Sequence, residues 1–165
     1  MSIVFSAEEV YEIGIQIEKN GRLFYQTVAS RMDDPDIARL FLYLSDWESR
    51  HVELFEHLKE NLSQESKGVD FFDPENIVHL YLKTVADQFI FIGEEAILKA
   101  AENIKTAQEA LKYALNFEKD SVVYYASMKE IVRDDLGKKE IDRLIQEEVY
   151  HVGQLTEELT RTKKA

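Results

Sequence analysis

The sequence predicts an all-α protein built as a four-helix bundle. Apolar residues recur every three or four positions along most of its 165 residues, as on one face of an amphipathic helix. Strong helix formers dominate, and two prolines and six glycines are few for this length. No segment alternates apolar and polar residues for long enough to predict a β-strand. We therefore expect four long helices, with further helix between the second and the third.

The first two helices are predicted to form a hairpin over about residues 7–61. Ser6 and Glu9 form a capping-box pattern at the start of the first helix, which should end near residue 31. Asp34 can cap a second helix, and Pro35 suits its first position. Because the connection is short, the two helices should lie antiparallel and side by side.

A second hairpin is predicted over about residues 106–160. Thr106 and Glu109 repeat the capping-box pattern, and the helix that they open should end near residue 134. Gly137 would then cap this helix at its C-terminus, and a final helix follows it.

A long, partly helical crossover of about residues 62–105 connects the hairpins. A polar loop is expected first, and Asp73 followed by Pro74 predicts a new helix start. This helix is apolar between Ile77 and Ile92 and should bend or break near Gly93. Its apolar face favours a homodimer or a higher homo-oligomer.

Composition excludes several kinds of site and partner. The chain has no cysteine, which removes disulfides, thiolate zinc sites, iron–sulfur clusters and cysteine nucleophiles. A net charge of -12 repels phosphates and argues against a nucleic-acid partner. No apolar run approaches the roughly 18 residues of a membrane span, and the N-terminus lacks a signal-peptide pattern. We therefore expect no membrane association, and a cytoplasmic protein with a single domain over residues 1–165.

An internal repeat relates the two hairpins. Each half carries a glutamate and, thirty residues later, a Glu-x-x-His motif, and the two halves match at a shift of 100 residues. The six residues are Glu18, Glu48 and His51 in the first half, and Glu118, Glu148 and His151 in the second. In each half the two glutamates lie about fifteen residues from the turn, which is about 22 Å along a helix. Folding the halves together about a pseudo-two-fold axis would bring all six to mid-bundle.

The chemistry of these six residues predicts a site for two metal ions. Four carboxylates at one buried level would repel one another and would lose their hydration, and cations would neutralise that charge. Carboxylates and imidazoles without sulfur suit iron or manganese, and zinc accepts the same ligand types. The same pattern of ligands is known in di-iron and di-manganese carboxylate bundles.

The alternative is that these residues are solvated charges on helix surfaces. A single Glu-x-x-His motif commonly has that role, because glutamate is abundant in helices. Two copies, each with a partner glutamate at equal spacing, favour the metal site instead. Glu147 could compete with Glu148 as a ligand, but the register of the repeat favours Glu148.

Several other residues have less specific interpretations. Tyr25 and Tyr125 each follow a predicted ligand by two helical turns and could hydrogen-bond it or carry a radical. Packing with one satisfied hydroxyl is the commoner role and is favoured. Trp47 is expected in the core or in a subunit contact, His57 at the surface and His79 on a helix face.

Four segments of the chain resemble the rubrerythrin-like branch of the ferritin-like superfamily. They are Ile17–Tyr25, Glu48–His51, Phe117–Tyr125 and Glu147–His151. The resemblance implies two bridging carboxylates, two terminal carboxylates and two imidazoles around two iron ions: Glu48 and Glu148, Glu18 and Glu118, and His51 and His151, respectively. It also implies an oxidoreductase that reacts with peroxide, oxygen or ferrous iron and takes electrons from an external donor.

The sequence departs from the family's pattern in two places. Rubrerythrins proper add a rubredoxin-like domain whose cysteines deliver electrons, and this chain has no cysteine. They also carry an extra glutamate one turn after the ligand of the third bundle helix, where this chain has Ser121. A metal site is therefore predicted more directly than peroxidase turnover. Two alternatives stay open: an iron-binding or storage protein without turnover, and an acidic helical interaction module with a vestigial site.

Overall fold

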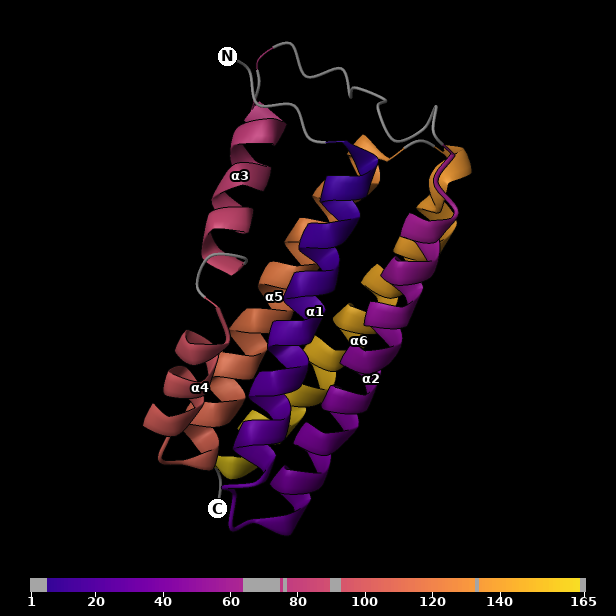
Figure 1. The fold of residues 1–165 in the computed structure, drawn as a ribbon. Helices are drawn as coiled ribbons and strands as arrows, with labels where there is room; N and C mark the ends of the chain where they lie inside the picture. The colour runs from indigo at the N-terminus through magenta and orange to yellow at the C-terminus, as the bar shows by residue number, and fades with distance from the viewer. Residues whose placement is uncertain (1–5, 64–74, 76, 90–92, 133, 164–165) are drawn as a thin grey trace.

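The computed structural model describes residues 6–63, 75, 77–89, 93–132 and 134–163, and within these ranges it contains helices and no strands. Four long helices form the bundle (Figure 1): α1 (Ala7–Ala29), α2 (Pro35–Glu60), α5 (Ala107–Ile131) and α6 (Lys138–Thr162). α1 contacts α2 along its length, and α5 contacts α6 in the same way, so each pair is a hairpin. The prediction of an all-α bundle of two hairpins is confirmed.

Side-chain caps start three of the four long helices where the sequence predicts them. At α1 the Ser6 backbone N–H donates to the Glu9 carboxylate over 2.8 Å, and the Glu9 N–H donates to the Ser6 hydroxyl over 3.2 Å. Thr106 and Glu109 make the same reciprocal pair at α5. At α2, the Asp34 carboxylate accepts from two backbone N–H groups of the first turn. Each cap contributes about 1 kcal/mol.

Gly137 was predicted to cap the preceding helix at its C-terminus, and this prediction is wrong. It directly precedes α6 instead. The backbone turns extended at Val132, so α5 ends at Ile131, before the predicted residue 134, and a short 3-10 turn, η1 (Asp134–Leu136), follows. Gly137 has φ 102°, in the left-handed region that favours glycine. A Cβ atom there would lie 2.5 Å from Cδ2 of Leu58, so the glycine also permits close approach to α2.

The crossover contributes two further helices, α3 (Ile77–Phe89) and α4 (Gly93–Asn103). Both contact α1, and Figure 1 shows them on the side of α1 away from α2. The predicted break lies at Gly93, which has φ 69°. The predicted helix start at Asp73-Pro74 and the apolar residues 90–92 lie outside the described residues. Ile77 and Leu80 of α3 are exposed, at 59% and 55%.

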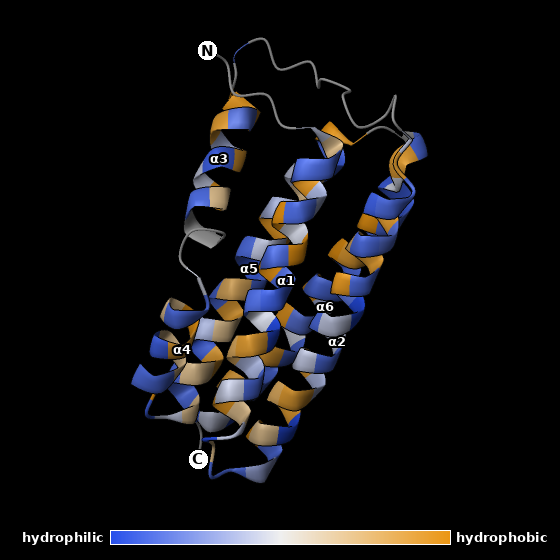
Figure 2. Cartoon of the chain, viewed as in Figure 1, coloured by the Kyte–Doolittle hydropathy of each residue, from blue (hydrophilic) through white to orange (hydrophobic). Residues whose placement is uncertain are grey.

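The core lies along the bundle axis and is rich in aromatic side chains. Hydrophilic and apolar residues form bands along each helix (Figure 2), as amphipathic helices require. Seven aromatic side chains at most 1% exposed are Tyr11, Phe24, Tyr25, Phe41, Phe55, Tyr124 and Tyr125. All six predicted ligand residues are buried in the same interior. They are therefore held away from solvent, which rules out the alternative of helix-surface charges.

Two helical glycines provide a matched test of packing beside the buried carboxylates. A Cβ at Gly21 would lie 2.7 Å from Cε1 of Phe117 and 3.0 Å from Oε1 of Glu48, whereas a Cβ at Gly153 meets nothing within 4 Å. We expect Gly21→Ala to destabilise the metal-free protein by about 1–3 kcal/mol, because the core cannot absorb the methyl group. Gly153→Ala should stabilise it by about 0.5–1 kcal/mol through helix propensity. Urea unfolding measures the free energy of unfolding of both variants. Equal effects of the two substitutions would contradict the close packing at Gly21.

Candidate metal centre

The six predicted ligand residues converge on one buried cluster inside the bundle. Each of the four long helices contributes to it: Glu18 from α1, Glu48 and His51 from α2, Glu118 from α5, and Glu148 and His151 from α6. Every one of these residues is at most 2% exposed. Glutamates from neighbouring helices meet because each lies about fifteen residues from the turn of its hairpin.

The three-residue step of each Glu-x-x-His motif places carboxylate and imidazole on adjacent rows of one helix. Nδ1 of His151 lies 3.1 Å from Oε2 of Glu148, and Nδ1 of His51 lies 3.8 Å from Oε2 of Glu48. Both imidazoles thus turn Nδ1 toward the carboxylates. Each pair can reach one common point.

The potential ligand atoms fall into two overlapping groups. Within each group the atoms lie within 4.8 Å of one another, which is close enough to surround one cation. The first group comprises Glu18, Glu48, His51 and Glu148, and the second comprises Glu118, Glu148 and His151. Glu148 belongs to both groups and can bridge two positions. Glu48, for which the resemblance also implies bridging, belongs to the first group alone.

His51 is held from both edges of its ring. Its Nδ1 lies 3.2 Å from Oε2 of Glu18 and 3.0 Å from Oε1 of Glu148, whereas Nε2 lies 3.2 Å from Oε2 of Glu147. Burial by itself would lower the pKa of His51, but the charge of Glu18 and the hydrogen bonds to these carboxylates raise it well above its usual range. The metal-free protein therefore holds a positive imidazolium where a cation would otherwise supply the charge.

The carboxylates of the cluster are poorly compensated without a cation. Burial raises the pKa of Glu48 and of Glu118 well above the usual range, and the charges of Glu18 and Glu148, respectively, raise it further. Burial also acts to raise the pKa of Glu18, but a hydrogen bond with Glu48 and the charge of His51 lower it overall. Like-charge repulsion is thus concentrated at this one level of the bundle.

Unpartnered oxygen atoms show that the donor set fits metal ions. Oε2 of Glu48 and Oε2 of Glu118 are buried and make no hydrogen bond within the described part of the chain. A buried acceptor without a partner costs about 1–3 kcal/mol. Cations coordinated by these oxygens would remove that cost together with the repulsion. Oxygen and imidazole nitrogen are also the ligands that iron, manganese and zinc accept.

Two tyrosine hydroxyls hold the carboxylates of Glu118 and Glu18 across the bundle. Tyr25 of α1 donates to Oε1 of Glu118 over 2.5 Å, and Tyr125 of α5 donates to Oε1 of Glu18. Burial and the nearby carboxylates raise the pKa of both phenols well above the usual value, so they remain protonated donors. Both rings are packed in the core with a satisfied hydroxyl, as favoured from the sequence, and the acceptor of each hydroxyl is a predicted ligand.

Glu147 has a contact that sequence analysis missed. Its side chain is 31% exposed and lies on the outer side of His51, to which it hydrogen-bonds. This hydrogen bond is the main reason that the pKa of Glu147 is lowered. A signal was present in the repeat, because Glu147 aligns with Trp47, and each precedes the glutamate of its motif. The alignment shows that Glu147 and Trp47 occupy equivalent positions in the two halves, but it does not show which residues their side chains contact.

The remaining residues of interest lie outside the ligand groups. The Ser121 hydroxyl is buried and donates to the backbone carbonyl of Phe117 over 3.1 Å, so it is satisfied by its own helix. His57 is exposed, as predicted, whereas His79 is buried on α3. Trp47 is half-buried, with its ring 6.0 Å from that of His51 and with Arg50 stacked over it at 4.6 Å.

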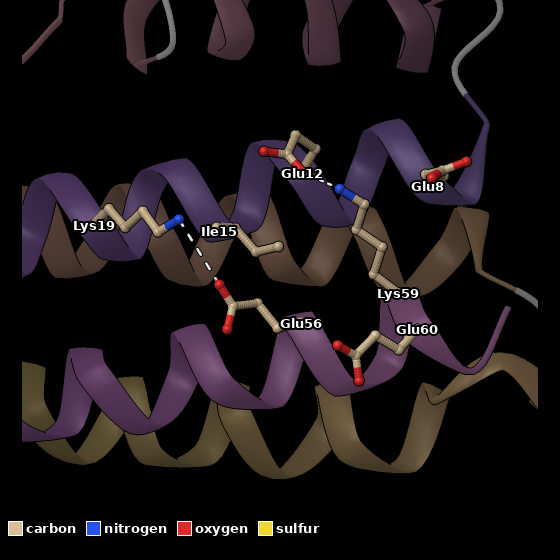
Figure 3. A pocket seen from close by; sticks show the side chains of 7 residues that line it. All are labelled: Glu8, Glu12, Ile15, Lys19, Glu56, Lys59 and Glu60. Atoms are coloured by element: carbon tan, nitrogen blue, oxygen red, sulfur yellow. Dashed lines mark hydrogen bonds and ion pairs between the residues drawn. The ribbon is translucent and has the colours of Figure 1, made fainter.

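A small cavity between α2 and α6 reaches the edge of the cluster. It has a volume of about 180 Å³ and is lined by Trp47, Arg50, His51, Leu54, Glu140, Arg143, Leu144 and Glu147. A larger groove of about 460 Å³ lies between α1 and α2 (Figure 3). Ion pairs of Lys19 with Glu56 and of Lys59 with Glu12 cross it, and no predicted ligand lines it. Of these two, the small cavity is the one that adjoins the candidate centre.

None of the described helices is long and apolar enough to cross a membrane.

Comparisons with known proteins bear on the fold and the family of the chain. The comparison with curated proteins gave no match. Among solved structures, the chain is similar to a Thermotoga maritima protein described as a ferritin-like diiron-carboxylate protein. The TM-score is 0.73 at 21% identity, over 96% of this chain and 97% of that chain, which shows a shared fold. The family model described as rubrerythrin matches residues 9–159. The chain therefore belongs to the rubrerythrin family.

Proposed function

We propose that the protein binds two iron ions and is an oxidoreductase that reacts with peroxide, oxygen or ferrous iron. The observation that carries this proposal is the buried cluster of four glutamates and two histidines, in which Oε2 of Glu48 and Oε2 of Glu118 lack hydrogen-bond partners among the described residues. Membership of the rubrerythrin family supports it, and so does the diiron-carboxylate description of the Thermotoga maritima protein of similar fold.

The two ligand groups suggest how the residues divide their roles. Glu18 and His51 would hold one ion and Glu118 and His151 the other, with Glu148 shared between them. Glu48 lies in the first group and would bridge if its free oxygen turned toward the second position. When bound, the metal pair supplies two-electron redox chemistry that the side chains by themselves lack.

The protein's own residues position the ligands and limit access of water. The hydroxyls of Tyr25 and Tyr125 fix the orientation of Glu118 and Glu18. The packed aromatic core keeps solvent from the carboxylates, which strengthens electrostatic interactions inside the site. The cavity beside His51 and Glu147 is wide enough for small molecules such as water, peroxide or oxygen. Electrons would come from an external donor, because the chain has no cysteine with which to build a rubredoxin-like electron carrier.

Iron binding or storage without turnover is the second candidate function. Ser121 stands where rubrerythrins proper carry an additional glutamate, and its hydroxyl is bonded to its own helix backbone. The position therefore supplies no further carboxylate to the centre. This observation favours a static metal site over a centre whose ligands change during peroxide reduction.

Metal titration under anaerobic conditions tests the proposed site. We expect two Fe(II) per chain and a higher Tm, because a ligand at a hundred times its dissociation constant stabilises the native state by about 2.7 kcal/mol. Glu148→Ala should abolish paired binding, since Glu148 belongs to both ligand groups. An unchanged Tm with Fe(II), Mn(II) and Zn(II) would instead support the interaction module with a vestigial site.

Oxidant addition separates the two candidate functions. The oxidoreductase should develop ferric absorption when peroxide or oxygen is added to the ferrous protein, lose it with reductant and regain it with oxidant. A ferrous protein that reacts with neither oxidant would contradict the oxidoreductase. Uptake of many more than two Fe(II) per chain would favour storage.

Glu118→Gln should stabilise the metal-free protein while it weakens metal binding. Burial and the charge of Glu148 disfavour ionisation of Glu118, whereas a glutamine is neutral at every pH and keeps the acceptor for Tyr25, so we expect a gain of about 1–3 kcal/mol. Because burial raises the pKa of Glu118, its stabilising protonated form is lost as the pH rises through that raised value. The advantage of the variant should therefore grow with pH in thermal unfolding. The exposed Glu157→Gln is the control, and an equal gain there would contradict this reasoning.

A further inference from the structure

The residue before each motif glutamate lies against the histidine of the other hairpin. Oε2 of Glu147 lies 3.2 Å from Nε2 of His51, and the Trp47 ring lies 5.7 Å from the His151 ring. Trp47 and Glu147 are 100 residues apart, so they occupy equivalent places in the repeat. The pseudo-two-fold relation is thus preserved in position but broken in chemistry, with a carboxylate on one side and an indole on the other.

The carboxylate of Glu147 completes a chain of contacts through His51. Nδ1 of the ring faces Glu18 and Glu148 inside the cluster, while Nε2 faces Glu147 outside it. A hydrogen bond from the outer nitrogen to a carboxylate fixes which nitrogen faces the metal and how the ring is turned. It also makes the inner nitrogen a stronger electron donor. His51 is therefore oriented for coordination before any cation arrives.

The surroundings of His151 are different. Its Nδ1 faces Glu148 at 3.1 Å, but its ring lies among the aromatic rings of Tyr43, Trp47 and Tyr150. The three ring centroids are 6.3, 5.7 and 6.5 Å from that of His151. Ring contacts restrict the imidazole by packing, yet they provide no carboxylate to polarise it. His151 is therefore the less strongly supported ligand.

The numbers of ligand atoms in the two groups also favour the position at His51. The group that contains His51 brings four ligand atoms within 4.8 Å of one another, and the group that contains His151 brings three. More ligand atoms and a better oriented imidazole both favour the position at His51. Two independent features of the site thus point to the same position.

We propose that Glu147 is a positioning residue that orients His51 and makes the metal position at His51 the tighter of the two. This inference rests on the proposed dimetal site and adds an order of filling to it. The first ion occupies the position of Glu18, Glu48, His51 and Glu148, and the second follows at Glu118 and His151.

Titration of the metal-free protein with Mn(II) tests the proposal without a turnover assay. Calorimetry should resolve two dissociation constants for the native protein. Electron paramagnetic resonance at one Mn(II) per chain should show isolated ions rather than coupled pairs. Glu147→Gln keeps the side-chain volume and loses the charge, so it should weaken the tighter constant by about 10- to 100-fold and leave the weaker one unchanged.

Two further variants separate positioning from packing. Glu147→Leu keeps bulk but provides no acceptor, so it should weaken the tighter constant at least as much as Glu147→Gln. Glu157→Gln, at an exposed position of the same helix, should change neither constant. An unchanged tighter constant in both Glu147 variants, or an equal loss at both positions, would overturn the proposal. A native protein that binds no Mn(II) or Fe(II) would overturn the dimetal site itself, together with this order of filling.

Discussion

The burial of four carboxylates and two imidazoles at one level of the bundle is the constraint on which the rest of the structure depends. Helix length, turn position and the spacing of the motifs all bring these groups to that level. The surrounding aromatic core excludes water, so repulsion among the carboxylates is screened little. A bundle that met only the needs of stability would place apolar side chains there. The cluster is therefore a cost to stability that contacts in the remaining core must offset.

The support comes from contacts that cross between the two hairpins. Tyr25 on α1 holds Glu118 on α5, and Tyr125 on α5 holds Glu18 on α1. These reciprocal hydrogen bonds tie each of the two carboxylates to the opposite half of the repeat. The protonated His51 adds partial charge compensation in the metal-free protein. Together they reduce the cost of the cluster, but they leave Oε2 of Glu48 and Oε2 of Glu118 without a hydrogen-bond partner among the described residues.

The two halves of the repeat share backbone geometry more closely than they share chemistry. The predicted ligand residues are the same in both halves, whereas their neighbours differ: Glu147 corresponds to Trp47. A carboxylate and an indole at equivalent places give the two imidazoles unlike surroundings. Ser121, bonded to its own helix, adds no carboxylate to the second half. An approximately symmetric scaffold therefore holds a chemically asymmetric centre.

The sequence by itself determined the helices, most of their starts and the six residues that meet, because periodicity, capping patterns and a repeat are properties of local order and spacing. Helix ends were less well predicted, as at Gly137, where a left-handed turn depends on space left by Leu58. Only the tertiary structure decided that Glu148 belongs to both ligand groups, that the tyrosine hydroxyls bond to carboxylates of the other hairpin, and that Glu147 lies against His51. The hydrogen bonds among these contacts join residues 93 to 107 positions apart. They depend on how the helices rotate and pack against one another, which spacing along a single helix does not specify.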